Sequence, residues 1–125
     1  MNILVAEDTP DNQFLIKRLL TRRGAKVKIA ENGQIAIDEA LTTPYDIIIM
    51  DVQMPQLDGH SATRELRARG YTGSIIALSA FAMKEARALS LAVGCNDHLA
   101  KPVDVQRLIA AIKLYTSVDT GSAFH

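Results

Sequence analysis

Short apolar runs alternate along the chain with segments in which apolar residues recur every three or four positions. Four runs, 3–6, 47–50, 75–78 and the weaker 99–100, predict strands. Their apolar residues are consecutive, so both faces of each strand should be buried, as in a parallel sheet covered by helices. A fifth segment, 27–29, is flanked by lysines and alternates in polarity, which predicts an edge strand.

Five helices are predicted between and after these strands. The first has Thr9 as its capping hydroxyl and Pro10 in its first turn, and it ends before Gly24. Asn32 precedes the second helix and Asp104 caps the last. The predicted apolar faces are, in chain order, Phe14, Leu15, Leu19 and Leu20; Ile37, Ala40 and Leu41; Ala62 and Leu66, with Arg64, Arg67 and Arg69 on the outer side; Leu89, Ala92 and Val93; and Val105, Leu108, Ile109 and Ile112.

Strand and helix alternate five times, which predicts an α/β fold with a parallel sheet and right-handed crossovers. At 125 residues the chain has the size of one domain. We expect that domain to occupy residues 1–116. Residues 117–125 are small and polar, and predict a tail or linker.

Composition narrows the range of functions. Fourteen basic residues balance fourteen acidic ones, so no general positive field favours direct binding of nucleic acid. No uncharged apolar run approaches the ~18 residues of a membrane span, and we expect a soluble domain without membrane contact. Cys95 is the single cysteine of the sequence, which excludes an internal disulfide and suits the reducing cytosol.

Polar side chains follow four of the five predicted strands. Glu7 and Asp8 come after the first, Asp51 after 47–50, Ser79 after 75–78, and Lys101 after 99–100. Parallel strands end at one edge of the sheet, where ligands of open α/β folds bind. We therefore expect three carboxylates, a hydroxyl and an ammonium to converge there.

Neighbouring carboxylates repel one another unless a cation or a proton neutralises them. Glu7, Asp8 and Asp51 offer the hard oxygen ligands that Mg²⁺ prefers, together with waters and phosphate oxygens. The set lacks the histidine and cysteine ligands of a zinc site and the twelve-residue loop of a calcium cage. The sequence therefore predicts a magnesium site.

Lys101 adds a positive charge to the same edge. It can form an ion pair with a carboxylate or hold a phosphoryl oxygen, while Ser79 donates to another; the two interpretations are compatible. Pro102 makes a cis peptide bond possible after Lys101. Asp51 then lies where a carboxylate nucleophile would accept a phosphoryl group and become an aspartyl phosphate. The loop after it turns away and leaves the backbone carbonyl of Gln53 able to reach the metal.

Four ordered motifs carry a family resemblance. "ILVAED", "IIIMDVQMPQLDG", "IIALSA" and "LAKP" resemble the acidic loop, phosphoacceptor segment, switch-hydroxyl strand and lysine–proline pair of response regulator receiver domains, from residue 3 to about 115. The resemblance implies a doubly wound, flavodoxin-like sheet of order 2-1-3-4-5. It implies no turnover enzyme, but a domain that catalyses its own phosphorylation and dephosphorylation.

The resemblance also implies a role for each site residue. Asp51 is the phosphoacceptor, and Asp8, Glu7 through water, and the Gln53 carbonyl hold Mg²⁺. Lys101 and Ser79 contact the phosphoryl oxygens, and Ser79 is the switch hydroxyl. The second switch position holds His98 where the family more often has tyrosine or phenylalanine, so the usual aromatic switch is in doubt. We expect His98 to lie at the surface or to pack, with rotation or a pH dependence as alternatives.

The segments "EDTPDNQ" and "MDVQMPQLDGHSATRELR" look most like receivers of hybrid sensor histidine kinases. That likeness implies a phosphohistidine partner, on a histidine kinase or a histidine phosphotransfer domain. The chain would then be part of a larger protein, a histidine kinase. We expect the domain to lie in the cytoplasm, either free or tethered to a membrane sensor kinase. A free-standing, single-domain response regulator is the alternative.

Three rival functions remain. An aspartyl-phosphate phosphohydrolase would share the nucleophile and metal, but Val52 and Gln53 supply no second acid or base. A flavin- or nucleotide-binding module would place a phosphate-binding loop where Glu7 and Asp8 stand. A receiver that binds partners without being phosphorylated would not need the complete set of reactive residues.

Overall fold

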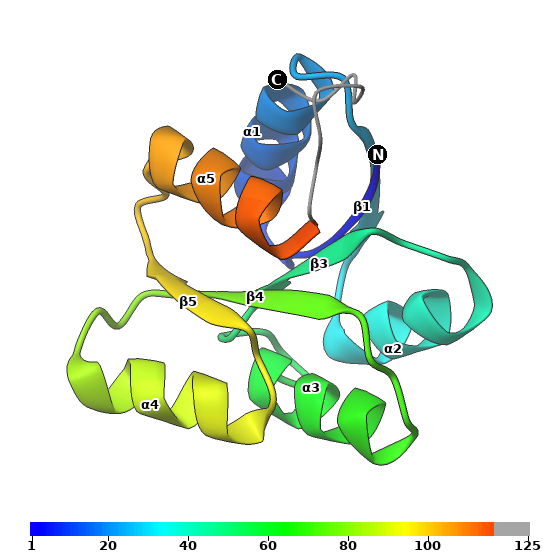
Figure 1. Cartoon of the computed structure of the whole chain (residues 1–125), viewed down its shortest axis with the longest axis vertical. Helices are drawn as coiled ribbons and strands as arrows, with labels where there is room; N and C mark the ends of the chain where they lie inside the picture. Colours follow the sequence, from blue (N-terminus) through cyan, green and yellow to red (C-terminus); the bar gives the residue numbers. More distant parts are fainter. Residues whose placement is uncertain (117–125) are drawn as a thin grey trace.

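The computed structural model describes residues 1–116, and the predicted tail at 117–125 lies outside them. Within this range five strands and five helices alternate, as predicted (Figure 1). The strands form one parallel sheet of order β2-β1-β3-β4-β5, which confirms the predicted fold class. The elements are β1 (Asn2–Ala6), α1 (Pro10–Thr21), β2 (Lys26–Ala30), α2 (Gly33–Thr42), β3 (Ile47–Asp51), α3 (Gly59–Ala68), β4 (Ser74–Ser79), α4 (Lys84–Val93), β5 (Asp97–Ala100) and α5 (Val105–Thr116).

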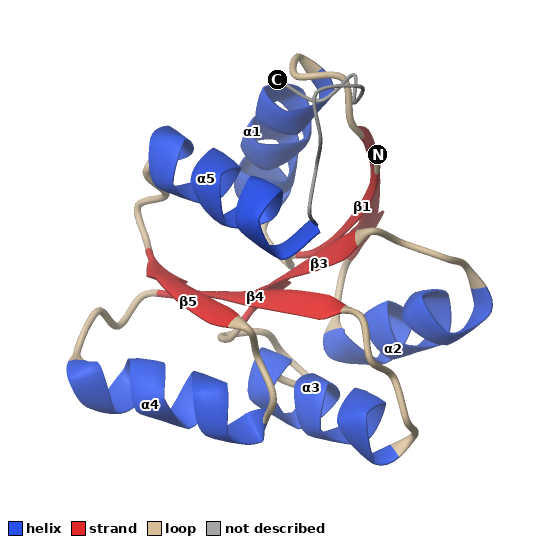
Figure 2. Cartoon of the chain, viewed as in Figure 1, coloured by secondary structure: helices blue, strands red, loops and turns tan. Residues whose placement is uncertain are grey.

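Helices cover both faces of the sheet. Figure 2 shows α1 and α5 on one face and α2, α3 and α4 on the other. Successive residues of the central strands enter opposite cores, so Leu4 and Ile48 pack under α2 and α3 whereas Ile3 and Ile47 pack under α1 and α5. The consecutive apolar runs of the sequence therefore fill two cores from one sheet.

The outer strands differ from the central ones. In β2 exposed and partly buried positions alternate up to Ala30, and β2 lies at the edge of the sheet, as predicted. Strand β5 begins at Asp97, two residues before the predicted run, and His98 is its most deeply buried residue. The backbone pairing with β4, and not an apolar run, defines β5.

The apolar face predicted for α1 was partly wrong. Ile16 and Leu20, four positions apart, are the buried residues of this helix, whereas Phe14 is 66% exposed and Leu15 63% exposed. At roughly 100° per residue, Phe14 lies opposite Ile16 on the helix. Sequence periodicity could not separate the two faces because both carry large apolar side chains. Four further predicted core positions are also exposed: Leu41, Leu89, Ala92 and Val105.

Helices begin at the predicted residues Asn32 and Asp104 and at Asp58, which was not predicted, and the prediction for Thr9 needs a correction. The side chains of Asn32, Asp58 and Asp104 accept hydrogen bonds from backbone N–H groups in the first turns of α2, α3 and α5. Within the described structure Thr9 occupies the N-cap position of α1 without a side-chain capping bond. The Thr9 carbonyl accepts the first backbone hydrogen bond of the helix, from the N–H of Gln13 at 2.9 Å.

Arg67 was wrongly predicted to lie on the outer side of α3. Its guanidinium turns back toward the α4–β5 connection and donates to the carbonyl of Gly94 at 3.0 and 2.9 Å and to that of Tyr71 at 2.7 Å. Gly94, at φ 116°, ends α4 as predicted. Arg67 therefore satisfies backbone oxygens at a helix end.

In residues 1–116 no helix is both long and apolar enough to cross a membrane.

The close approach of α3 to β3 makes Gly59 a sensitive position. A Cβ atom on Gly59 would collide with the backbone oxygen of Asp51. We expect Gly59→Ala to lower the free energy of unfolding by about 1–3 kcal/mol, although alanine is the better helix former. Urea denaturation measures the change. Arg64→Ala, on the exposed side of the same helix, should change stability by less than about 0.5 kcal/mol; equal stability of the two variants would contradict this packing argument.

Candidate functional site

The carboxyl ends of the strands bring the predicted polar residues together. Glu7 follows β1, Asp51 ends β3, Ser79 ends β4 and Lys101 follows β5. Parallel pairing sets the positions of these residues along the strands. Asp51 lies beside Leu78, and the Lys101 N–H donates to the Ser79 carbonyl at 2.7 Å. The sheet itself therefore aligns the four side chains at one edge, as the sequence predicted.

Three carboxylates form a cluster there. One oxygen each from Glu7, Asp8 and Asp51 lies within 4.8 Å of the others. Glu7 is 0% exposed and Asp51 1% exposed, while Asp8 is nearer to solvent. Two acidic groups are thus almost fully removed from water, a costly arrangement unless a positive charge, a metal or a proton neutralises them.

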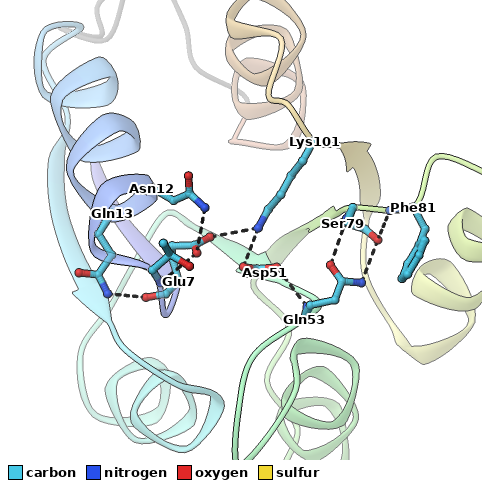
Figure 3. A network of polar contacts seen from close by, with 10 residues as sticks. Glu7, Asn12, Gln13, Asp51, Gln53, Ser79, Phe81 and Lys101 are labelled. Carbon is cyan, nitrogen blue, oxygen red and sulfur yellow. Dashed lines mark hydrogen bonds and ion pairs between the residues drawn. The ribbon is translucent and has the colours of Figure 1, made fainter.

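Lys101 supplies one positive charge. Its Nζ lies 2.7 Å from Oδ2 of Asp51 and 3.4 Å from Oε2 of Glu7, which is the ion pair considered above (Figure 3). The peptide bond between Lys101 and Pro102 is cis. One ammonium thus serves two buried carboxylates.

The first turn of α1 supports Glu7 with groups that sequence reasoning missed. Oε1 of Glu7 accepts from the N–H of Thr9 at 3.2 Å and from Nδ2 of Asn12 at 3.4 Å. Nε2 of Gln13 donates to the Glu7 backbone oxygen at 2.6 Å. The "PDNQ" stretch carries a usable signal, since amides in the first helical turn after an acidic pair lie close to that pair.

The electrostatic balance differs between the two buried carboxyl groups. Burial raises the pKa of Asp51 to about 6, with the Glu7 carboxyl adding to the rise and Lys101 opposing it. Burial also disfavours ionised Glu7, but hydrogen bonds from Asp51 and the Thr9 N–H, together with Lys101, lower its pKa. Burial opposes the charge of Lys101, yet its contact with Asp51 and the charge of Glu7 raise its pKa. Asp51 is therefore the incompletely neutralised member of the site.

Ser79 contacts the loops beside the site. Its Oγ accepts from the N–H of Phe81 at 3.0 Å and from Nε2 of Gln53 at 3.2 Å, while Oε1 of Gln53 accepts from the N–H of Ala80 at 3.0 Å. The N–H of Gln53 donates to Oδ1 of Asp51 at 3.1 Å. Gln53 thus joins Asp51 to Ser79, contacting Asp51 through its backbone N–H and Ser79 through its side chain. The metal contact of the Gln53 carbonyl and the phosphoryl contact of Ser79 stay predictions.

His98 packs in the interior and is only 6% exposed, so the surface alternative was wrong and the packing alternative is confirmed. Its Nδ1 lies 2.7 Å from Oγ of Ser90, and its Nε2 lies 3.0 Å from the carbonyl oxygen of Phe81. Oγ of Ser90 also lies 2.7 Å from Nε2 of His60. Sequence reasoning missed Ser90 and His60, because nothing in one sequence places residues of α3, α4 and β5 in contact.

The donor set suits a hard divalent cation. Three carboxylate oxygens are close together, one of them on a group whose pKa shows incomplete neutralisation. Mg²⁺ is held in proteins by few carboxylates and several waters, so the residues present fit it. The fold and site together define a doubly wound α/β domain with an acidic pocket at the carboxyl edge of its sheet.

The response regulator receiver domain model matches residues 3–113, and the chain belongs to this family. It is 36% identical over 121 residues, or 93% of its length, to sensor histidine kinase GacS of Pseudomonas protegens. It is 42% identical over 119 residues, or 88% of its length, to hybrid signal transduction histidine kinase I of Dictyostelium discoideum. The chain spans only 13% and 7% of these two proteins, so it is homologous to their receiver parts.

Solved receiver structures agree with the fold. The receiver of sensor histidine kinase PA1611 from Pseudomonas aeruginosa, which holds a magnesium ion in its active-site cleft, is 39% identical, with TM-score 0.85 over 94% of this chain and 98% of that chain. The receiver of Saccharomyces cerevisiae Ssk1, crystallised with the phosphotransfer protein Ypd1, is 28% identical, with TM-score 0.86 over 98% and 95%. The acidic pocket of Glu7, Asp8 and Asp51 is like the magnesium site of phosphoacceptor receivers.

The raised pKa of Asp51 predicts a pH dependence of stability. Folding favours the protonated carboxyl, so this group's contribution is present below its usual pKa of 3.8 and is lost as pH rises through about 6. Asp51→Asn stays neutral and should match the wild type near pH 4. At pH 7 it should be more stable, by at most roughly 3 kcal/mol.

Denaturant unfolding of both proteins from pH 4 to pH 8, in buffer free of divalent cations, measures this difference. Addition of Mg²⁺ at pH 7 should reduce it, because a cation neutralises the ionised wild-type site. A variant that is equally or less stable than the wild type at pH 7 would show that Asp51 is not an uncompensated charge.

Proposed function

We propose that this domain is the phosphoacceptor of a two-component phosphorelay and that Asp51 is its nucleophile. The observation that carries the proposal is the position of Asp51, buried at the end of β3 beside Glu7, Asp8 and Lys101. A carboxylate oxygen of Asp51 forms a bond to phosphorus as the bond from phosphorus to the donor's imidazole nitrogen breaks. The electron pair of that broken bond stays on the imidazole.

We propose that Asp8, Asp51, the Gln53 carbonyl and, through water, Glu7 hold Mg²⁺. The bound ion supplies electrostatic stabilisation of the transferring phosphoryl group. The residues of this chain do the remaining work. Glu7 is fixed by Thr9 and Asn12, and this support keeps its carboxylate at the pocket.

Lys101 and Ser79 complete the proposed site. Lys101, now paired with Asp51, can exchange this contact for a phosphoryl oxygen as the Asp51 charge passes into the acyl phosphate. Ser79 Oγ accepts from Gln53 and Phe81, and we propose that it gives up these contacts as it moves to a second phosphoryl oxygen. That exchange of partners is the proposed switch, and partner binding responds to it.

The proposed partner is a phosphohistidine on a histidine kinase or a histidine phosphotransfer domain, by analogy with the Ypd1–Ssk1 complex. The similarity to hybrid kinases supports a receiver within a longer chain in the cytoplasm. A free-standing response regulator is the alternative. The receiver family is not a family of turnover enzymes, which argues against the phosphohydrolase.

Asp51→Asn should abolish labelling by acetyl phosphate in the presence of Mg²⁺, because an amide is not a competent nucleophile. Intact-protein mass spectrometry measures the gain of one HPO₃. The matched control is Asp38→Asn, on the exposed face of α2, which should label like the wild type. Labelling that persists in Asp51→Asn would identify another acceptor and refute the assignment.

Asp8→Asn should weaken Mg²⁺ binding by at least about tenfold, since it removes one of the few charged ligands of a hard cation. Isothermal titration calorimetry gives the affinity. Asp11→Asn, a nearby change in the first turn of α1, serves as the control and should leave it unchanged. If both variants bind Mg²⁺ like the wild type, the ion does not use Asp8.

A further inference from the structure

A chain of polar groups crosses the α3–α4 side of the domain. It runs from His60 on α3 to Ser90 on α4, then to His98 on β5, and ends at the carbonyl of Phe81 before α4. We call these four groups the Ser90 relay. Ser90 is 0% exposed and His98 6% exposed, whereas His60 is half-buried. Oγ of Ser90 lies 2.7 Å from a ring nitrogen of each histidine.

The end group of the relay fixes one proton, and with neutral rings the other protons follow from it. A carbonyl oxygen can only accept, so Nε2 of His98 carries a proton and donates to Phe81. In the neutral ring Nδ1 is then an acceptor, and the Ser90 hydroxyl donates to it. The Ser90 oxygen accepts in turn from Nε2 of His60. One arrangement of protons satisfies every group when both rings are neutral.

The surroundings of His60 favour its neutral form. Burial lowers the pKa of His60, with Arg64 and His98 adding to the effect and Asp58 opposing it. If both rings were charged, the Ser90 oxygen would face two N–H donors, and its own proton would lose the acceptor on His98. On α4, Arg87 donates to Asp97 and to the backbone oxygen of His98, so its contacts hold the β5 backbone and not the ring.

The relay meets the site at Phe81. The N–H of this residue donates to Oγ of Ser79 at 3.0 Å, while its carbonyl accepts from His98 at 3.0 Å. Phe81 is thus held at both of its backbone polar groups. Ser79 cannot leave the Phe81 N–H without either orphaning that N–H or moving the segment that His98 anchors.

We propose that Ser90 and His98 are positioning residues that hold the Phe81 backbone and, through it, keep the Ser79 hydroxyl away from the phosphoryl site. This inference rests on the proposed phosphoacceptor function. The relay opposes the partner exchange of Ser79, so breaking it makes a phosphoryl group easier to accommodate. A purely structural role would lower stability and leave the affinity of the site unchanged.

The test uses beryllofluoride, a phosphoryl mimic, titrated with Mg²⁺ into the whole chain. Ser90→Ala should bind it about two- to twelvefold more tightly, the ratio that corresponds to one net hydrogen bond. Ser90→Thr restores the hydroxyl and should return the affinity to that of the wild type. Ser74→Ala is the matched control: its hydroxyl lies at the other end of β4, bonded to the Tyr115 carbonyl, and its loss should change nothing.

A second variant protects the test against misfolding of Ser90→Ala. His60→Gln alters only the half-buried end of the relay, and it should tighten binding of the mimic in the same direction by a smaller factor. Unchanged or weaker binding in both variants overturns the proposal.

Side-chain ¹⁵N spectra, recorded without the mimic, give an independent reading. The relay requires a proton on Nε2 of His98 and none on Nδ1, and removal of the Ser90 hydroxyl should shift the Nδ1 signal. A proton on Nδ1 of a neutral His98 overturns the proton order and the proposal with it. If the wild type fails to bind beryllofluoride, the phosphoacceptor function falls too, whereas equal affinity in wild type and variants removes the relay alone.

Discussion

The site depends on two carboxyl groups that share one ammonium in a place closed to water. Glu7 and Asp51 are almost fully buried, and Lys101 contacts both. Burial raises the pKa of Asp51 to about 6, and the Glu7 carboxyl adds to the rise because one ammonium cannot neutralise two carboxylates. This uncompensated negative charge favours a cation at the pocket, because a well-neutralised set of side chains would gain little from binding one.

The sheet makes this unfavourable arrangement possible. Glu7 and Asp51 lie at the ends of β1 and β3, whose apolar residues fill the two cores, and Lys101 follows β5, which is paired with β4. The burial of those strands supplies the free energy that holds the charges together. Backbone pairing then sets the position of Lys101, whose N–H is bonded to the Ser79 carbonyl. A function that requires like charges at close range is therefore best carried by the most stable part of the fold.

The sequence predicts an element correctly where its pattern of apolar residues has one explanation. It fails where buried and exposed positions carry the same kind of residue. The strand predicted at 47–50 was found as β3 (Ile47–Asp51), because four consecutive apolar residues bounded by polar ones are typical of a short strand buried on both faces. In α1 the buried Ile16 and the exposed Phe14 are both apolar, so the sequence could not tell which side of the helix faces the core. Glu7, Asp51 and Lys101 could be predicted to converge because strand ends share an edge. The contact between Ser90 and His98 could not, because it depends on how α4 packs against β5.

Gln53 shows how the acidic pocket and the Ser90 relay become one connected structure. Its N–H binds Asp51 and its side chain binds Ser79, whose hydroxyl also receives the Phe81 N–H. In the described chain every fully buried side-chain nitrogen and oxygen atom has a hydrogen-bond partner. An apolar aromatic ring in place of His98 would fill space but would not fix the Phe81 carbonyl. Histidine there adds a hydrogen bond to the Phe81 carbonyl, a directional contact that an apolar ring cannot make.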